Sequence, residues 1–306
     1  MKNYIFSSAI GLLVLTLVQF LTLSGDNTEL KVYFLDVGQG DSSLITYPTG
    51  ERLLIDTGKD SKVFRSLDKV LPWYDKTIEY VLITHGDSDH LGAMLDILDR
   101  YQVQKVFVSQ FFGQIEIEKD ILERLKEEGV IVEVVTQGDM LTFGTSVQNS
   151  FEIMHPDPNC FERNNQSENE CSLVSLLTYG AHSFLFTGDI GKKVETEIKD
   201  NIPSPLTVLK VAHHGSNGSS DLDFLLKIKP QYSVISYGEN SYGHPHLEVI
   251  ERLTLASSTI FKTKEDATIV ASSDGTTFEI KSLFDKSSFF ESSICSVLLY
   301  GFDTSC

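Results

Sequence analysis

Short hydrophobic runs separated by polar turns follow one another along most of the chain, with the periods of strands and amphipathic helices. In the first half, strands are expected at Leu30–Val37, Ser42–Tyr47, Arg52–Asp56, Tyr80–Thr84, Lys105–Ser109 and Val130–Val135, and helices at Ser61–Leu71, Leu91–Tyr101 and Glu116–Glu128. In the second half, strands are expected at Phe151–His155, Ser172–Tyr179, Ser183–Thr187, Leu206–Val211, Tyr232–Ser236 and Thr259–Thr263, and helices at Gly191–Lys199, Asp221–Lys227 and His246–Leu253. Each half begins with strands and continues in strand–helix alternation, which predicts two sheets packed face to face with helices outside.

One apolar run is longer than the others. Ile5–Leu23 carries no charge over 19 residues. At about 1.5 Å per residue it approaches the roughly 30 Å of a bilayer core. Residues 1–28 are therefore expected to be a cleaved signal peptide or an uncleaved membrane anchor, with a buried core helix as the third alternative. Export predicts an extracytoplasmic protein, secreted or anchored to the cytoplasmic membrane, with one domain over 29–281 and a Ser- and Phe-rich tail over 282–306.

The chain is acidic, with 25 Lys and Arg residues against 43 Asp and Glu residues and a formal net charge of −18. Charge-driven binding along DNA requires basic residues on many phosphates, so this balance argues against it. The sequence also lacks a Lys/Arg cluster or an aromatic stripe of the kind that single-strand binders use. A length of 306 residues with 41% hydrophobic residues is enough to bury a full core.

The four cysteines fall into two pairs, Cys160 with Cys171 and Cys295 with Cys306, each pair 11 positions apart. An even number of cysteines in an exported chain favours disulfides. Three connectivities are possible, and the local one, within each pair, is our hypothesis. Four independent thiols are the alternative.

The strongest chemical signal lies in a loop after an apolar strand. His85, Asp87, Asp89 and His90 fall within six residues. Imidazoles and carboxylates at alternating positions of a loop can point inward toward two metal ions. Histidine ligands favour Zn²⁺, and the share of carboxylates leaves Mn²⁺ open.

This loop and five other segments resemble the metallo-β-lactamase superfamily, whose signature is His-x-His-x-Asp-His; Asp87 stands here in place of the second histidine. The resemblance is closer to one branch, the hydrolase domain of the DNA-uptake competence protein ComEC and its stand-alone exported relatives. The matching segments are Phe34–Ser42, Leu54–Gly58, His85–His90, Phe186–Asp189, Leu209–Ser216 and Tyr242–His246. The resemblance implies an α/β (α+β) fold, a four-layer αββα sandwich with a two-metal site at the edge where the sheets meet.

Carried over by position, the metal ligands would be His85, Asp87, Asp89, His90, Asp189 and one of His213 and His214, with His214 preferred. His85 and Asp87 would bind one ion. Asp89 and His90 would bind the other, and Asp189 would bridge the two. Asp189 as the N-cap of the following helix is the alternative for the same oxygens.

One departure from the family weakens the first ion site. The family's middle histidine falls at Ser167–Cys171, where Asn169 is the nearest match. Cys171 could supply a thiolate unless a disulfide to Cys160 removes it. His155 could compensate, although a surface or supporting position is favoured for it. The first ion is therefore expected to be held by few protein groups.

Other segments suggest contacts to the substrate. The small residues of Gly215–Ser220 precede a helix, and backbone N–H groups there could approach an anion, with Ser216 and Asn217 nearest; a plain loop is the alternative. His244 and His246 could protonate the leaving group or hold a phosphate oxygen, and Asp89 is the third expected catalytic residue. Asp36, Asp41 and Asp56 are expected to orient ligand histidines.

The resemblance implies a metal-dependent hydrolase in which two ions, about 3.5–4 Å apart, lower the pKa of a bridging water and stabilise the charge developing on the substrate. The ComEC branch favours a phosphodiester, in DNA or another nucleic acid. The acidic composition keeps other functions open: a cell-wall phosphocholine ester, a lactone or β-lactam, or a non-catalytic binding module on the same fold. A membrane contact is expected only through the N-terminal segment, and no protein partner is indicated.

Overall fold

The computed structural model describes residues 29–144, 149–163 and 167–283. The predicted signal or anchor segment, Cys295 and Cys306 lie outside the described residues, so the second disulfide and the choice between signal and anchor stay predictions. In the part of the chain that the structure describes, no helix is long and apolar enough to cross a membrane.

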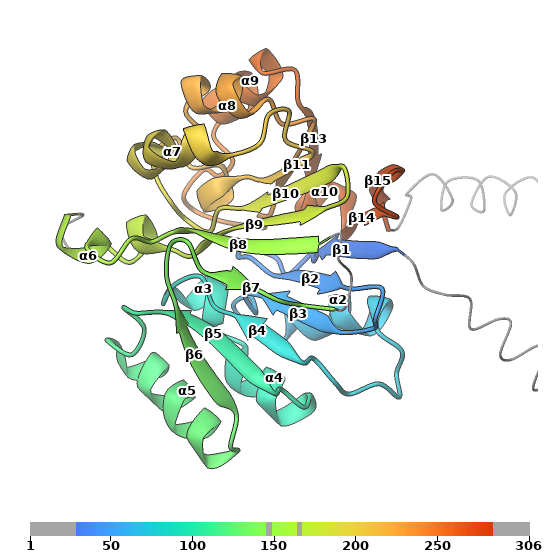
Figure 1. Ribbon diagram of the computed structural model, residues 1–306, viewed down its shortest axis with the longest axis vertical. Helices are drawn as coiled ribbons and strands as arrows, with labels where there is room; N and C mark the ends of the chain where they lie inside the picture. The colour runs from blue at the N-terminus through green and yellow to red at the C-terminus, as the bar shows by residue number, and fades with distance from the viewer. Residues whose placement is uncertain (1–28, 145–148, 164–166, 284–306) are drawn as a thin grey trace, which may run out of the picture.

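Two sheets lie face to face in the centre of the molecule (Figure 1). The first has eight strands in the order β15-β14-β1-β2-β3-β4-β5-β6. Their bounds are β1 (Leu30–Phe34), β2 (Ser43–Thr46), β3 (Arg52–Ile55), β4 (Tyr80–Leu82), β5 (Lys105–Ser109), β6 (Ile131–Val135), β14 (Ile269–Ser273) and β15 (Phe278–Ser282). The second has seven strands in the order β13-β12-β11-β10-β9-β8-β7. Their bounds are β7 (Met140–Leu141), β8 (Asn149–His155), β9 (Val174–Tyr179), β10 (His182–Phe186), β11 (Val208–Lys210), β12 (Tyr232–Ile235) and β13 (Thr259–Lys262).

Helices cover the outer face of each sheet (Figure 1). Over the first sheet lie α2 (Lys62–Val70), α4 (Met94–Arg100) and α5 (Glu116–Glu127). Over the second lie α7 (Lys192–Ile198), α8 (Leu222–Ile228) and α9 (Leu247–Leu255). Short helices α3 (Ser88–Leu91), α6 (Cys160–Arg163) and α10 (Thr263–Asp266) lie in connections. The predicted αββα sandwich is confirmed.

Each helix packs through one apolar face. In α2, Val63 and Leu67 are four positions apart and fully buried against the first sheet. In α9, Val249 and Leu253 do the same against the second sheet. In α5, the Glu118 carboxylate accepts hydrogen bonds from the N–H groups of the three residues before the helix, at 2.8–3.1 Å, which fixes where the helix begins.

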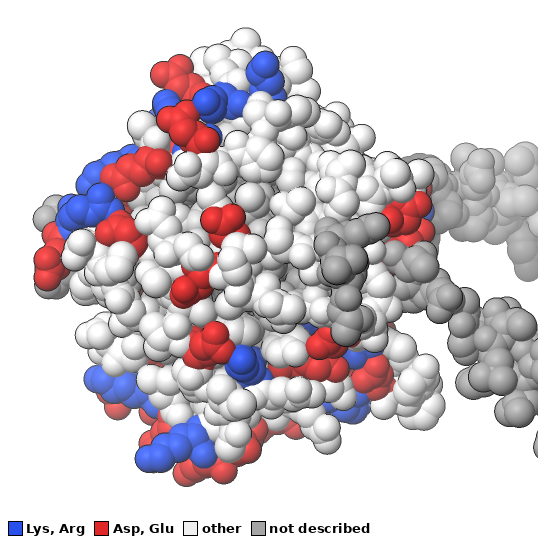
Figure 2. Space-filling model, in the orientation of Figure 1, with Lys and Arg blue, Asp and Glu red and all other residues white. Residues whose placement is uncertain are grey.

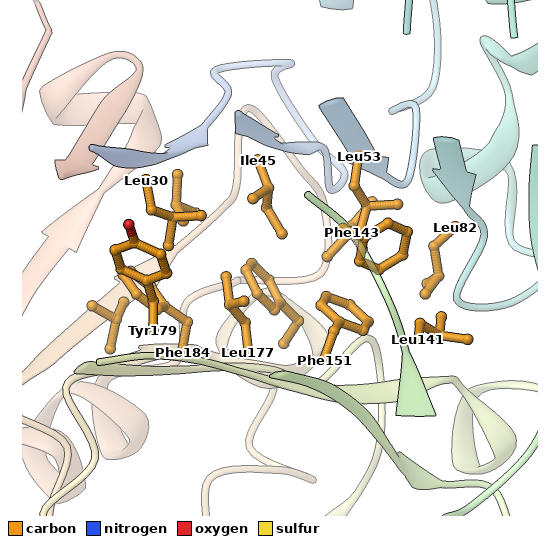
Figure 3. Close-up of a cluster of buried hydrophobic side chains, with 14 of the residues drawn as sticks. Leu30, Ile45, Leu53, Leu82, Leu141, Phe143, Phe151, Leu177, Tyr179 and Phe184 are labelled. Atoms are coloured by element: carbon orange, nitrogen blue, oxygen red, sulfur yellow. The ribbon is translucent and has the colours of Figure 1, made fainter. Parts of the chain in front are cut away.

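The central core lies between the two sheets. Leu30, Ile45 and Leu53 point from the first sheet toward Leu177 and Phe184 of the second (Figure 3). The core is rich in aromatic rings, and their contacts join both sheets. This packing sets the two sheets against each other and so fixes the edge along which the polar loops meet.

Strands β14, β15 and β7 were not predicted. β14 and β15 complete the first sheet, because β14 pairs with β1 along its whole length and β15 pairs with β14. Both contain serines and only short apolar runs, so their own pattern is weak, and the pairing with β1 decides their structure. The helix expected at Leu91–Tyr101 is α4, which begins at Met94; a separate short helix, α3, ends at Leu91.

Phe143 joins the core of the two sheets, and its loss should destabilise the fold. Its ring is 2% exposed and contacts the rings of Tyr47, Tyr80, Phe107 and Phe151. Phe143→Ala should lower the free energy of unfolding by about 3–5 kcal/mol, because it leaves a cavity. The measurement is urea unfolding followed by circular dichroism. Val134→Ala, at a 58% exposed strand position, is the control and should change stability by less than about 0.5 kcal/mol; equal effects would contradict this assignment.

Candidate metal centre

The predicted ligand residues come from three loops that the sheets bring to one edge. β3 to β6 pair in parallel in the first sheet, and β10 to β13 pair in parallel in the second. The carboxyl ends of parallel strands lie at the same edge of a sheet, and polar sites form there. His85 follows β4, Asp189 follows β10, and His213 and His214 follow β11.

The first group of donor atoms comes from His85, Asp87 and Asp189, whose atoms lie within 4.8 Å of one another. His85 Nε2 is 3.5 Å from Asp87 Oδ2 and 4.0 Å from Asp189 Oδ2. His85 and Asp189 are buried, whereas the Asp87 side chain is 47% exposed. This group therefore opens to solvent on the side of Asp87.

The second group, Asp41, His90, Asp189 and His214, includes the same Asp189. His90 Nε2 is 3.2 Å from Asp189 Oδ1, and His214 Nε2 is 3.7 Å from Asp189 Oδ2. Asp89 Oδ2 lies 3.3 Å from His214 Nε2. Asp189 is thus shared by the two groups. It is not a helix cap, because Gly191 occupies the N-cap of α7.

Buried atoms in this cluster lack hydrogen-bond partners. Among the described residues, none donates to or accepts from His85 Nε2, His90 Nε2, His214 Nε2 or Asp189 Oδ1 with hydrogen-bond geometry. Buried polar atoms without partners are costly, and these four converge. Imidazole nitrogens and carboxylate oxygens are the donors that zinc and manganese take. The cluster therefore fits divalent metal ions.

The charges of the cluster are strongly coupled. Burial raises the pKa of Asp189, but His90 and His214 outweigh it and hold this pKa well below its usual range. Burial lowers the pKa of His214, but Asp189 and Asp41 outweigh it and raise this pKa to about 10. The buried carboxylates thus stabilise positive charge nearby, and without metal ions this charge is a proton on a histidine such as His214. Metal binding should displace these protons.

A second layer of hydrogen bonds orients the histidine rings. Asp56 Oδ2 is 2.8 Å from His90 Nδ1, and both Asp56 oxygens accept from Thr84, through its N–H and its hydroxyl, each at 2.8 Å. The same hydroxyl lies 3.0 Å from His85 Nδ1. These contacts leave the Nε2 atom of each ring facing the cluster. Asp56 thus lies where it was expected to orient a ligand histidine.

His214 is held from behind in the same way. Its Nδ1 is 3.0 Å from the carbonyl oxygen of Ser236 and 3.3 Å from Asp41 Oδ1. The buried ammonium of Lys210 lies 2.5 Å from Asp41 Oδ2. Lys210 and His214 together lower the pKa of Asp41 to about 2, against the effect of burial. Lys210 was not given a role from the sequence, although it lies in a matching segment.

Asp36, which was also expected to orient a ligand histidine, contacts none of the described ligand histidines in the structure, and His213 is not enclosed as His214 is. Asp36 bonds to its own loop, its Oδ1 accepting from the N–H of Gly38 at 3.3 Å. His213 is partly exposed, and its Nε2 is 3.7 Å from Asp189 Oδ2. His213 thus faces the open side of the centre, whereas His214 is enclosed. Of the two, His214 has the more ligand-like position.

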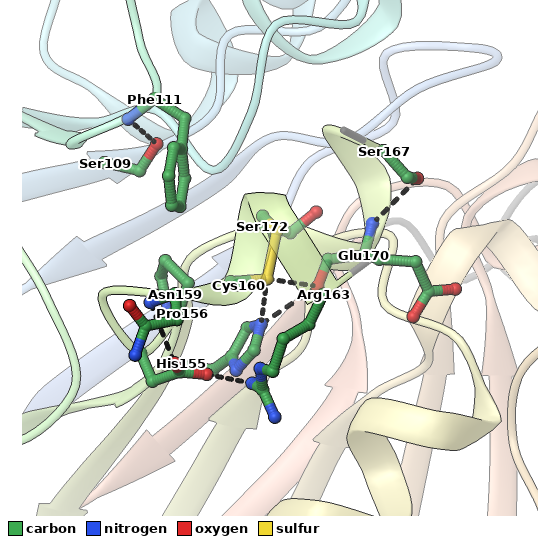
Figure 4. The surroundings of a disulfide bond; sticks show 12 residues. Ser109, Phe111, His155, Pro156, Asn159, Cys160, Arg163, Ser167, Glu170 and Ser172 are labelled. Atoms are coloured by element: carbon green, nitrogen blue, oxygen red, sulfur yellow. Dashed lines mark hydrogen bonds and ion pairs between the residues drawn. A yellow bond between two sulfur atoms is a disulfide. The ribbon is translucent and has the colours of Figure 1, made fainter. Parts of the chain in front are cut away.

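The structure joins Cys160 and Cys171 in a buried disulfide. Cys171 is therefore not available as a thiolate ligand. His155 packs beside the disulfide: its Nε2 is 3.3 Å from Cys160 Sγ and 2.9 Å from the carbonyl oxygen of Glu170 (Figure 4). Of the surface and supporting positions favoured for it, the structure shows a supporting one, because His155 is buried. Its contacts place it with the disulfide, which leaves the first ion site without the compensating histidine.

The end of the loop closed by the disulfide, with Ser172 directly after it, contacts residues on two sides of the first donor group. Asn169 begins the 3₁₀ helix η1 (Asn169–Cys171), and its carbonyl oxygen accepts from the Ser172 hydroxyl at 2.7 Å. That hydroxyl accepts from the N–H of Asp189 at 3.2 Å. On the other side, the N–H of Gly86 donates to the Glu168 carboxylate. What the structure shows for Asn169 is a backbone contact, and its amide as a metal ligand stays a prediction.

The segment expected to bind an anion is already hydrogen-bonded. The buried Glu195 carboxylate accepts from the N–H groups of Ser220 and Asp221, at 2.6 and 2.8 Å. Asn217 Oδ1 accepts from Arg252 at 2.9 Å, and Ser216 Oγ accepts from the N–H of Gly218 at 3.3 Å. Ser216 and Asn217 do not line the cavity at the metal centre. The structure thus does not bring these two residues to the site. At the end of the segment, the carboxylate of Glu195 already accepts from the N–H groups that were expected to bind an anion.

A cavity of about 160 Å³ opens above the donor groups. It is lined by Gln39, Asp87, Asp89, Asp189, His213, His214, Tyr242 and His244. His246 is the N-cap of α9 and does not line it. Gln39 and Tyr242 belong to matching segments but had no role from the sequence, since nothing in their local pattern shows that the two segments meet. Burial and the neighbouring histidines lower the pKa of His244 to about 4, so its ring is neutral at pH 7.

The disulfide should matter for metal binding at the first donor group. It fixes the segment that bonds to Gly86 and Asp189, and contacts of this kind change metal affinity by about 10- to 100-fold. The double variant Cys160→Ala/Cys171→Ala should therefore bind one of two ions more weakly by that factor, measured by competition with a chromophoric chelator. Cys295→Ala/Cys306→Ala is the matched control and should keep both affinities. Unchanged affinities in the first variant would refute this role.

Glu195 should make stability depend on pH. Burial raises its pKa from 4.5 to about 7, so the folded chain binds this proton more tightly than the unfolded chain does. Its contribution to stability is therefore complete below pH 4.5 and is lost as the pH rises through 7. Urea midpoints measured from pH 4 to 8 should fall less steeply in Glu195→Gln than in the wild type. Parallel curves would rule this out.

A family model described as a β-lactamase superfamily domain matches residues 51–215, more than half of the chain. The chain is 32% identical over 262 residues to ComE operon protein 3 of Bacillus subtilis (strain 168), which covers 79% of this chain and 33% of that protein. It is 29% identical over 269 residues to Recombination protein 2 of Haemophilus influenzae, and this match covers 84% of this chain and 30% of that protein. The chain thus spans about a third of the length of these curated relatives.

A solved structure with the same fold is Zn²⁺-bound PqqB from Methylobacterium extorquens, with a TM-score of 0.54 and 12% identity over 76% of this chain and 97% of that one. An identity this low shows the fold alone. The matched family model, the αββα sandwich and the ComEC-like relatives agree with the resemblance found in the sequence. The chain belongs to the metallo-β-lactamase superfamily.

Proposed function

We propose that this protein is an extracytoplasmic phosphodiesterase that uses two divalent metal ions. The observation that carries the proposal is the position of Asp189, whose buried carboxylate is shared by two convergent donor groups. Paired ions of this kind are typical of enzymes that hydrolyse phosphate esters. Bound ions would supply an activated water at neutral pH and neutralise charge on the phosphoryl group.

The donor set supports a phosphate ester over a β-lactam. Asp87 replaces a histidine of the family signature. The two donor groups also contain the carboxylates of Asp41 and Asp189, and Asp89 lies beside His214. Oxygen donors favour harder cations, which leaves both zinc and manganese suitable. Harder cations in turn suit the oxygens of a phosphodiester. The name of one relative, Recombination protein 2, and the ComEC resemblance both favour nucleic acid as the substrate.

Some residues of this chain would hold the metal ions, and others would orient the histidine rings. His85, Asp87, Asp89, His90, Asp189 and His214 would hold the ions. Asp56, through its contact with His90 Nδ1, and Asp41, through its ion pair with His214, keep two of the histidine rings in place. His244, neutral at pH 7, lines the cavity with a buried Nδ1 that has no partner among the described residues. It is suited to hydrogen-bonding a phosphate oxygen, and less suited to protonating a leaving group.

Removing the shared carboxylate should abolish both metal binding and hydrolysis. Full-length protein in detergent would be analysed for bound metal and assayed with bis(p-nitrophenyl) phosphate, single-stranded DNA, a phosphocholine ester and nitrocefin. The wild type should bind two ions and cleave bis(p-nitrophenyl) phosphate and DNA, and chelation should stop cleavage. Asp189→Asn should lose both ions and at least about 10³-fold in kcat/KM, since the paired ions provide several kcal/mol of transition-state stabilisation.

Asp223→Asn, which changes an exposed carboxylate on α8, is the matched control and should behave as the wild type. Cleavage of nitrocefin alone would assign the site to β-lactams. Cleavage of a phosphocholine ester but not of DNA would assign it to cell-wall esters. A metal-loaded protein without hydrolysis of any of these substrates would indicate a binding module.

A further inference from the structure

The cavity at the metal centre has one wall made of aromatic rings. The ring centroids of His213 and His244 are 5.6 Å apart, and those of His244 and Tyr242 are also 5.6 Å apart. The planes of His244 and Tyr242 differ by 30°, so these two rings are nearly parallel. The row starts at His213, next to Asp189, and ends at Tyr242, which is 68% exposed. It leads from the donor groups to the surface.

The loop that carries the outer rings is held in place. The Asn240 side chain accepts from the N–H groups of Tyr242 and His244, both at 3.1 Å. It also donates to the carbonyl oxygens of Gly238 and His244, at 3.0 and 2.9 Å. One amide thus ties together the backbone of the whole turn. An exposed aromatic side chain on such a turn loses little freedom when a flat ligand covers it.

The cavity offers no cation for a nucleic-acid backbone. Among the described residues that line it, none is Lys or Arg. On the face shown in Figure 2, Lys and Arg lie among acidic residues and do not gather in a patch. Affinity for the part of the substrate outside the metal centre must therefore come from uncharged contacts. Aromatic rings supply such contacts, since bases stack on them whatever their sequence.

The volume of the cavity indicates which part of the substrate lies at the outer end of the row of rings. A cavity of about 160 Å³ can take a phosphate group, whereas the substituents of that phosphate must lie at its rim. Tyr242 is the exposed ring at this rim. We propose that Tyr242, backed by His244, is the stacking subsite for the nucleobase adjacent to the scissile phosphate of a single-stranded nucleic acid. This rests on the proposed phosphodiesterase function and names its substrate class.

The subsite can be tested by binding without cleavage. A short single-stranded oligonucleotide with 2-aminopurine and non-hydrolysable phosphonate linkages would be added to the metal-loaded full-length protein in detergent, and fluorescence quenching by stacking would be followed. The wild type and Tyr242→Phe should quench it, since both have the ring. Tyr242→Ala should bind at least about tenfold more weakly, the range of one lost stacking contact. Tyr74→Ala removes a 70% exposed tyrosine before β4, at the opposite end of that strand from the metal centre, and should bind as the wild type does.

Kinetics provide an independent readout. KM would be compared for oligonucleotides with and without a base beside the scissile phosphate. Removing the base and removing the Tyr242 ring should each raise KM about tenfold with little change in kcat, and the two losses should not add. Additive losses, or equal quenching by Tyr242→Ala and the wild type, would overturn the subsite. Quenching that depends on Tyr242 without hydrolysis would keep the subsite and overturn the phosphodiesterase.

Discussion

The site depends on one buried negative charge, the carboxylate of Asp189. It is 3% exposed and lies between His85, His90 and His214. A buried carboxylate is stable only where positive charge compensates it. Here the compensation comes from groups on both sheets, since Asp189 follows β10 while the first two histidines follow β4. The charge of Asp189 is therefore compensated only when the two sheets are packed against each other as they are here.

That constraint explains why the surroundings are so heavily hydrogen-bonded. Asp56, Thr84 and Asp41 hold the rings by their outer nitrogens, and Lys210 balances Asp41. The backbone is left-handed at both His213 and His214, with φ of 50° and 51°. The side-chain contacts of His214 and the bond from the N–H of His213 to the carbonyl oxygen of Gly188 hold this turn. The fold thus keeps several imidazole nitrogens directed at one another, an arrangement that protons or cations must stabilise.

Much of this was predictable from the chain alone, for identifiable reasons. The loop from His85 to His90 is dense in donors and follows an apolar strand, so local pattern revealed it. Asp189 and His214 were reached only through the family resemblance, because no local signal links positions so far apart. Glu195 was not predicted to be buried, because a glutamate in a helix is usually exposed to solvent. Only the tertiary structure shows that it accepts hydrogen bonds from the N–H groups of Ser220 and Asp221. The row of rings formed by His213, His244 and Tyr242 could not be predicted from the sequence, because its members come from two separate segments.

The acidity of the chain and a nucleic-acid substrate are compatible if binding is local. An extended DNA site needs many cations, and a net charge of −18 opposes it. A site that engages one phosphate through metal ions and one base through a ring needs no basic surface. It would also be nearly insensitive to salt, in contrast to a protein that releases many counterions on binding. Such a site would favour flexible single strands and ends over duplex, because in a duplex the base is already stacked and paired.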